Sequence, residues 1–385
     1  MPAEKSKATI MLQRLVSARE ALGLTQKEAA EQLGFKNYQT LLQIEQGKRT
    51  ISAHELISLS RLYGRDLDYF FDTNITHDPV PLWRKSPDAE EKEIKNIQRE
   101  FLTFLEHYSN LESLLNLKRR WKDIQVSHEK DDFEHEGYRL INKLSSDIHK
   151  RLDLGSRPAC NLLNVLENDL RFKIFHLPLE GVSGACVVDN SLGVGILVNE
   201  NEVPWRRNYD LAHELFHIMT WDVFSVKEIG DGIKRTRPER YADAFAASLL
   251  MPEDHFLNAL KEITTDDTIR MVDIIELAMD FGVSSEAVLW RLVNLGKLKE
   301  AQVKRILGDP EFKEMDRRFR REHYEKNIPS KYPERFVSLA CRCLMEGKIS
   351  RGIFAAYIDK ERHEVDSYLA ENGFIEEHYE KIGVA

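Results

Sequence analysis

Residues 211–218 read LAHELFHI, and this stretch decides the fold class of the larger part of the chain. His213 and His217 are four residues apart, so on a helix their imidazoles project from nearly the same face, about one turn apart. Two such histidines fill two positions of the tetrahedral ligand set that zinc prefers. Glu214 stands one step round the helix, where its carboxylate can act as a general base without being a ligand. The alternative is a surface helix with two solvated histidines.

A second segment, residues 238–245 with the sequence PERYADAF, supplies two carboxylates. Glu239 follows His217 by 22 residues, which leaves room for a loop and a returning helix. Glu239 can therefore be the third ligand, and one position stays open for water, as a catalytic zinc site requires. Asp243, one turn on, can hydrogen-bond the free nitrogen of a ligand histidine and fix its tautomer. Two alternatives stay open: Asp243 is the ligand and Glu239 lies outside, or these are surface carboxylates, with Glu239 complementing a helix dipole.

The segments around these motifs predict a mainly α protein with a small β-sheet, an α+β class. Strand-like runs precede the histidine helix at residues 172–177, 184–188 and 193–199. Asp189-Asn190-Ser191 suits a hairpin turn between the last two runs. The histidine helix is expected to begin near Trp205, and Pro238 fits the first turn of a following helix.

Residues 157–300 resemble the ImmA/IrrE-type metallopeptidases. The resemblance rests on the AHELxH core at 212–217, an ExxAxxFAxxLLMP-like block at 239–252, a strand pair near 182–184 and 196–199, and trailing helices at 277–298. Many members of that family have glycine where this chain has Phe216, a position that is not expected to touch the ligands. The resemblance implies a gluzincin-like site with one zinc ion per chain. It also implies, as is common in the family, cleavage of a DNA-binding repressor in response to stress.

The N-terminal segment carries a second motif, GLTQKEAA at residues 23–30. Thr25 with Glu28 three residues on is a capping box, which predicts a helix start. A turn at Gly34 leads to a second helix around 38–45. Residues 8–73 resemble XRE-type (lambda-repressor-like) helix-turn-helix domains, although the turn is one residue longer than the common form. The alternative is a helical protein-interaction module.

The candidate DNA contacts fall into two groups. The polar face of the second helix is expected to contact base edges through Gln39, Thr40 and Gln43. Gln26, on the first helix, is placed where it could brace the DNA backbone or a base. Phosphates are assigned to basic residues at the ends of the elements: Lys36, Lys48 and Arg49. We expect double-stranded operator DNA as the partner and a homodimer as the binding form.

The charge distribution confines DNA contact to the N-terminal segment. The net charge is −9, yet residues 1–73 hold 10 Lys+Arg against 9 Asp+Glu, so the acidic remainder would repel phosphates. Four cysteines are too few and too scattered for a disulfide framework. Apolar runs are shorter than the ~18 residues a membrane span needs, and the N-terminus lacks a signal-peptide pattern. These features predict a cytoplasmic protein that does not enter a membrane.

The predicted organisation has four parts. They are a helix-turn-helix domain at 8–73, a linker and helical spacer or oligomerisation arm at 74–156, the metallopeptidase domain at 157–300, and a helical C-terminal region at 301–385. The spacer carries an apolar stripe of seven residues: Phe101, Phe104, Leu105, Tyr108, Leu111, Leu114 and Leu115.

Three hypotheses about function follow from these motifs. In the first, the protein binds its operator and hydrolyses a peptide bond in itself or in a partner repressor. In the second, it is a transcription factor whose peptidase-like domain senses a metal or a ligand without turnover. In the third, it is an antitoxin-like or scaffold protein in which both modules serve binding. The complete His, Glu, His and Glu set favours the first, because a structural zinc site needs no general base.

Overall fold

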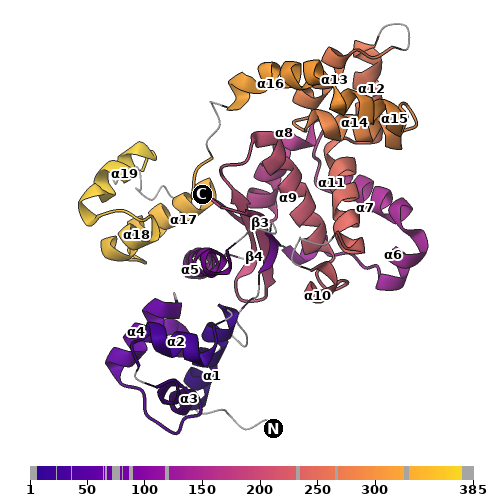
Figure 1. Cartoon of the computed structure of the whole chain (residues 1–385). Coiled ribbons are helices and arrows are strands. Elements are labelled where there is room, and N and C mark those ends of the chain that lie inside the picture. The colour runs from indigo at the N-terminus through magenta and orange to yellow at the C-terminus, as the bar shows by residue number, and fades with distance from the viewer. Residues whose placement is uncertain are drawn as a thin grey trace.

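The structure is a computed structural model of the whole chain. It describes residues 7–22, 24–35, 37–63, 65, 67–71, 79, 81–85, 90–117, 121–230, 235–264, 268–324 and 329–374. Figure 1 shows a central sheet with helices on both faces, and a separate group of N-terminal helices at one end of the molecule.

The N-terminal helices enclose a core of their own. They are α1 (Lys7–Ala21), α2 (Gln26–Gln32), α3 (Gln39–Glu45), α4 (Ala53–Tyr63) and the 3-10 helix η1 (Leu67–Phe71). Their core holds Leu15, Ala29, Leu41, Leu59 and Phe70, each fully buried. The predicted capping box is confirmed: the Glu28 amide donates to Thr25 Oγ1 at 3.2 Å, and the Thr25 amide donates to Glu28 Oε2 at 2.7 Å. The sequence therefore located the start of the first motif helix correctly.

The central sheet has four strands in the order β1-β3-β4-β2. They are β1 (Leu82–Lys85), β2 (Lys173–Leu177), β3 (Val182–Asp189) and β4 (Gly193–Asn199). β2 runs parallel to β4, whereas β1 and β3, and β3 and β4, pair antiparallel. The three predicted strands are confirmed. β1 was missed, because it falls where the sequence predicted a linker and four residues between prolines carry too little periodicity to reveal a strand.

One face of the sheet is covered by the helices that carry the site. They are α9 (Pro204–Met219) and α11 (Arg237–Leu250), with α6 (Lys130–Glu136), α7 (Tyr138–Arg151), α8 (Pro158–Asn164), the π-helical turn η3 (Val165–Asp169) and α10 (Val226–Ile229) around them. α9 contacts β3 and β4 directly and crosses α11. The predicted starts of these two helices, near Trp205 and at Pro238, are confirmed.

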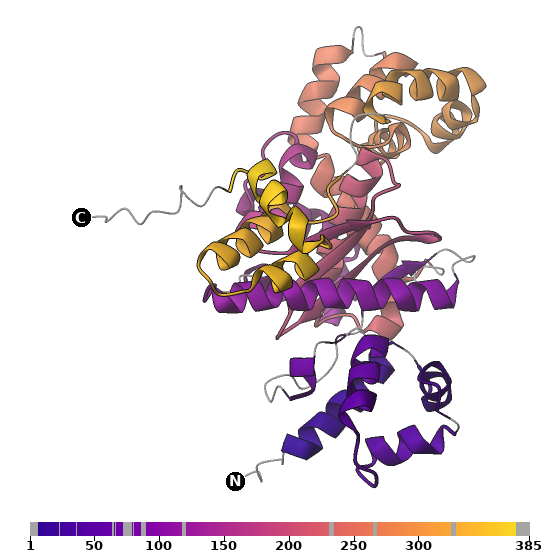
Figure 2. The same cartoon turned by 90° about the vertical axis from the view of Figure 1, so that its left-hand side faces the viewer.

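The opposite face of the sheet is covered by α5 (Glu91–Leu114), which Figure 2 shows running along the molecule with the C-terminal helices beside it. Six of the seven stripe residues are buried there, and Leu114 packs at the margin. A Cβ at Gly195 would lie 2.6 Å from Leu105, so this glycine lets α5 approach β4 closely. α5 is thus part of the core, and the spacer interpretation is wrong for it, because its stripe packs on this chain's own sheet.

The remaining helices divide between these two cores. α12 (Glu253–Ile263), α13 (Met271–Asp280), α14 (Ser285–Asn294), α15 (Glu300–Gly308) and α16 (Pro310–Tyr324) extend the side of α9. α17 (Glu334–Met345), α18 (Arg351–Tyr357), the turn η4 (Arg362–Glu364) and α19 (Val365–Glu371) pack with α5. A further turn, η2 (Trp121–Ile124), follows α5. The mainly α, α+β class is confirmed. Within the described ranges, each helix is too short or too polar to cross a membrane.

Candidate metal centre and nucleic-acid interface

The histidine motif lies in the last three turns of α9, under the sheet. Pro204 stands in the first turn of this helix, where its missing N–H costs nothing. The apolar side chains of Leu211, Leu215 and Ile218 hold α9 against the core. His213 and His217 are fully buried, and Glu214 is 1% exposed. Burial of three ionisable groups on one helix indicates a built site, because such groups are rarely buried without partners.

Glu239 is brought to α9 by the capped start of α11. Thr236 precedes this helix and its Oγ1 donates to the carbonyl of Ile229 at 2.9 Å. The same oxygen accepts the Glu239 amide at 3.4 Å. The cap therefore holds Glu239 in the first turn of α11, where its carboxylate faces α9.

Three predicted ligands meet in the structure. His217 Nε2 lies 3.1 Å from His213 Nε2 and 3.1 Å from Glu239 Oε1, and His213 Nε2 lies 3.4 Å from Glu239 Oε2. The three candidate ligand atoms are all within 4.8 Å of one another. Burial alone would raise the pKa of Glu239, but its contacts with His213 and His217 outweigh burial and hold that pKa well below the usual range.

Asp243 lies on the far side of His213, one turn along α11 from Glu239. Its Oδ1 is 3.1 Å from His213 Nδ1, and it accepts a 2.7 Å hydrogen bond from the Tyr209 hydroxyl. Burial and the charge of Arg84 act to lower the pKa of His213, yet Asp243 and Glu239 raise it overall. Asp243 therefore faces the ring nitrogen opposite the one that faces Glu239, which is the position expected of a group that orients a ligand histidine.

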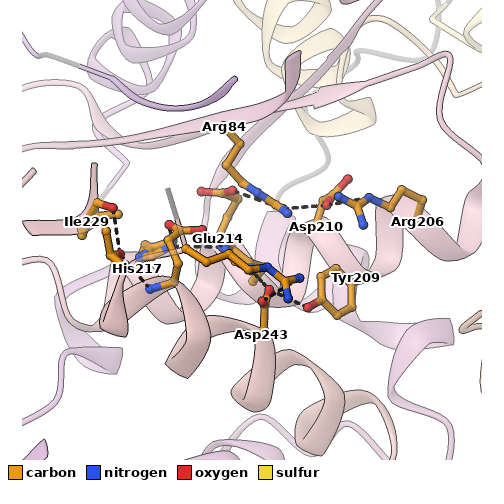
Figure 3. Close-up of polar contacts among 12 residues, drawn as sticks. Arg84, Arg206, Tyr209, Asp210, Glu214, His217, Ile229 and Asp243 are labelled. Carbon is orange, nitrogen blue, oxygen red and sulfur yellow. Dashed lines mark hydrogen bonds and ion pairs between the residues drawn. The ribbon is translucent and has the colours of Figure 1, made fainter. Parts of the chain in front are cut away.

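Glu214 points into the same site (Figure 3), and its side chain is buried. Among the described residues, neither of its carboxylate oxygens has a hydrogen-bond partner, although both are buried. Its neighbour Cys186, on β3, has a raised pKa because of burial and because of the Glu214 carboxylate. A buried carboxylate whose oxygens accept no hydrogen bond is costly, so its place beside the three candidate ligands calls for a functional explanation.

A group of charges that the sequence did not reveal borders Glu214. Arg84, on β1, has its Nη1 2.7 Å from Asp210 Oδ1 and 3.9 Å from Glu214 Oε1 (Figure 3). Arg206 Nε lies 3.3 Å from the same Asp210 oxygen. Burial raises the pKa of Asp210, and the two arginines oppose that rise.

A signal for two of these missed residues was present in the sequence. Asp210 and Tyr209 each precede a motif residue by four, Glu214 and His213 respectively, so the helical repeat places them on the same faces. Arg84 carries no such signal, because more than a hundred residues separate it from α9.

The donor set fits zinc. Two imidazole nitrogens and one carboxylate oxygen form the three-ligand set of a catalytic zinc site. The carboxylate of Glu214 beside that set, with no hydrogen bond to its oxygens among the described residues, is the feature a general base needs. The arrangement can thus hold a divalent ion and remove a proton from water next to it.

Some of the predicted helix-turn-helix contact residues are exposed, and others are engaged in contacts within the domain. Gln39 and Gln43 are exposed and one turn apart on α3, Thr40 is half-buried, and Lys48 is exposed beyond the helix end. Gln26 donates to Glu45 Oε2 at 2.7 Å, which links α2 to α3. Arg49 Nη2 contacts Glu55 at 2.8 Å. Lys36 lies outside the described residues. Tyr38, at the start of α3, is 47% exposed and was not among the predicted contacts.

The comparisons with known proteins match both motifs. The helix-turn-helix family matches residues 15–70, and the family described as the IrrE N-terminal-like domain matches residues 168–293. None of the curated proteins matches the chain. Among solved structures, a Mycobacterium tuberculosis transcriptional regulator is similar, with 15% identity over 48% of this chain and a TM-score of 0.30. The chain spans about half, 51%, of that protein. On the two family matches alone, the chain joins an XRE-type helix-turn-helix domain to a domain of the ImmA/IrrE type, as the sequence resemblance predicted.

Proposed function

We propose that this protein is an operator-binding regulator whose ImmA/IrrE-type domain is a zinc-dependent peptidase that cleaves a repressor or the chain itself. The observation that carries the proposal is the buried carboxylate of Glu214, which adjoins His213, His217 and Glu239 and whose ion-pair contact with Arg84 is a long one, at 3.9 Å. A site that only stored or sensed a metal would gain nothing from burying that carboxylate. The regulator would act in the cytoplasm, where operator DNA lies.

Each residue has a distinct role in this proposal. His213, His217 and Glu239 would hold the ion, with two imidazole nitrogens and a carboxylate oxygen as the donors. Zinc bound there would polarise a peptide carbonyl and lower the pKa of water. The Glu214 carboxylate takes a proton from the attacking water as the new C–O bond forms. It then passes the proton to the leaving amine as the C–N bond breaks. Asp243 keeps His213 in the tautomer that presents Nε2.

The direct test of the proposal is a cleavage assay. The purified protein is incubated with zinc and with the repressor encoded beside its gene, in the presence and absence of single-stranded DNA, and products are identified by mass spectrometry. Cleavage at one bond, lost on chelation and restored by zinc, is the expected result. Intact repressor and intact chain under all conditions would contradict the peptidase proposal.

The metal site makes a quantitative prediction. The wild-type protein should bind about one zinc per chain, and His213→Ala or His217→Ala should lose most of it. Asp243→Ala should lower zinc affinity or activity less, on the order of 10–100-fold, because only ring orientation is affected. Elemental analysis measures the content, and His54→Ala, an exposed histidine on α4, is the matched control. Equal zinc in wild type and in the His213→Ala, His217→Ala double variant would overturn the ligand assignment.

The DNA-binding surface makes a second prediction. Gln43→Ala should cost about 1–3 kcal/mol at the preferred operator and relax sequence choice, because a base contact is lost. Lys48→Ala should weaken binding to all sequences alike and reduce the salt dependence, because a phosphate contact is lost. Binding of full-length protein to a palindromic promoter fragment at several salt concentrations measures both. Gln32→Ala, on α2 facing α5, is the control. Uniform weakening by Gln43→Ala would show that α3 does not read bases.

A further inference from the structure

The strand β1 lies on the outer edge of β3, directly beside the candidate site. Its residues pair antiparallel with β3 in the register Leu82 to Cys186, Trp83 to Ala185 and Arg84 to Gly184, and the register shifts after Arg84. β1 is therefore a short strand that covers the edge of the sheet nearest Glu214. An uncovered sheet edge is a template on which another extended chain can pair.

The contacts of Arg84 show how closely this strand engages the site. Its guanidinium reaches from the sheet edge to α9, 2.7 Å from Asp210 and 3.9 Å from Glu214. Asp210 also contacts Arg206 at 3.3 Å, so it keeps a cationic partner when Arg84 is removed. Removal of Arg84 from the site would therefore take a cation away from Glu214 without leaving Asp210 as an unpaired buried charge.

We propose that the outer edge of β3 is the binding site for an extended peptide, and that β1 occupies it as an internal substitute which must leave before a peptide binds. Pairing with a sheet edge supplies main-chain hydrogen bonds to any extended peptide, and side-chain contacts then select among sequences. A peptide in the register of β1 lies alongside Glu214 and the three candidate ligands. The catalytic meaning of this site rests on the proposed peptidase function, whereas the binding itself does not.

The side chains of β1 define the chemistry of the peptide that fits. Leu82 is 2% exposed and packs in the core on the side of α9, next to its cross-strand partner Cys186. Trp83 is 7% exposed, packs on the opposite face and donates from Nε1 to Gln98 Oε1 at 3.2 Å. Arg84 meets two carboxylates. The site therefore takes an extended segment with a large apolar residue, an aromatic residue and a basic residue in succession.

The proposal is tested by peptide binding to the full-length, metal-free protein. The probe is a fluorescent peptide with the sequence of residues 80–87, VPLWRKSP, followed by anisotropy. Leu82→Ser removes an apolar anchor of β1 and should tighten probe binding about 10- to 100-fold over wild type, because the competing strand is weakened. A probe carrying the change Arg84→Glu should bind poorly to both proteins, because it places a third carboxylate beside Asp210 and Glu214.

A disulfide lock provides the matched comparison. Directly opposed residues on antiparallel strands have the spacing that a disulfide accepts, so Leu82→Cys can be oxidised onto the native Cys186. The oxidised form should bind no probe, and its reduced form should bind as Leu82→Ser does. Leu82→Ser treated with the same oxidant is the control, since it loses the same side chain and cannot form the bond. Equal probe binding by the oxidised and reduced forms would overturn the proposal.

Hydrogen exchange tests the wild-type chain without any substitution. Saturating probe should accelerate exchange of the amides of 82–85 and leave those of β4, 193–199, protected. Binding without exposure of β1, or absence of binding even by a natively folded Leu82→Ser, would also overturn the proposal. The two proposals fail separately. If the probe displaces β1 but the protein cleaves no substrate, only the peptidase proposal is contradicted. If the disulfide-locked form still cleaves substrate, only the proposed role of β1 is contradicted.

Discussion

Glu214→Gln is expected to lower the rate of repressor cleavage by about 10²- to 10⁴-fold while zinc content stays near that of wild type. Glutamine keeps the size and the helical position of the side chain, and both histidines and Glu239 still hold the ion. The amide cannot accept the proton of the attacking water, so only the chemical step is lost. The measurement is single-turnover cleavage with elemental analysis of the same sample.

The same variant separates the competing functions in the cell. A reporter under the native promoter should stay repressed after DNA damage or another stress when the chain carries Glu214→Gln. Asp222→Asn is a suitable control, because it is also a carboxylate-to-amide change but lies beyond the end of α9, in contact with Gln125. Full derepression with uncut repressor would support a sensor that acts without turnover. A promoter unaffected by either variant or by stress would favour the antitoxin-like or scaffold function.

Glu112→Gln is expected to lower the free energy of unfolding by about 3–5 kcal/mol. Glu112 is 4% exposed and lies between two cations, Lys173 Nζ at 3.0 Å and Arg335 Nη1 at 2.7 Å. Glu112 lies on α5, Lys173 on β2 and Arg335 on α17. The Glu112 carboxylate thus links one strand of the sheet to a helix that precedes the strand in the sequence and to a helix that follows it. Glutamine removes the negative charge that faces a fully buried lysine and a mostly buried arginine, so the two cations lose the Coulomb stabilisation of this carboxylate. Urea unfolding followed by circular dichroism measures the change.

A more exposed group of charges at the C-terminal end of α17 provides the control for this stability prediction. Glu346 contacts Arg342 at 2.7 Å and Lys348 at 3.0 Å, but its side chain is 32% exposed. Glu346→Gln should therefore cost less than about 1 kcal/mol, because solvent screens the pair. Equal effects of the two substitutions would show that the Glu112 network does not hold α17 to the sheet.

The sequence alone predicted the features that depend on local periodicity. His213, Glu214 and His217 share a helix, so the 3.6-residue repeat was sufficient to predict that the two rings would face one point. The capping box at Thr25 and the three strands at 173–199 follow from equally local rules. Glu239 was assignable because 22 residues after His217 leave room for a loop and a returning helix, and because Pro238 marks the first turn of that helix. The DNA contacts stay predictions, since their polar residues are typical of any solvated helix face.

Only the tertiary structure decided which distant segments complete the site. Arg84 reaches Asp210 and Glu214 because β1 adds to the edge of β3, a long-range pairing that four residues cannot signal. The stripe on α5 was visible in the sequence, but an apolar helix face has the same pattern whether it packs on a partner or on its own chain. Its burial on the sheet was settled by Gly195, which removes the side chain that would hold α5 away. Periodicity shows which side chains lie together on one element, whereas the pairing of elements depends on contacts between residues far apart in the chain.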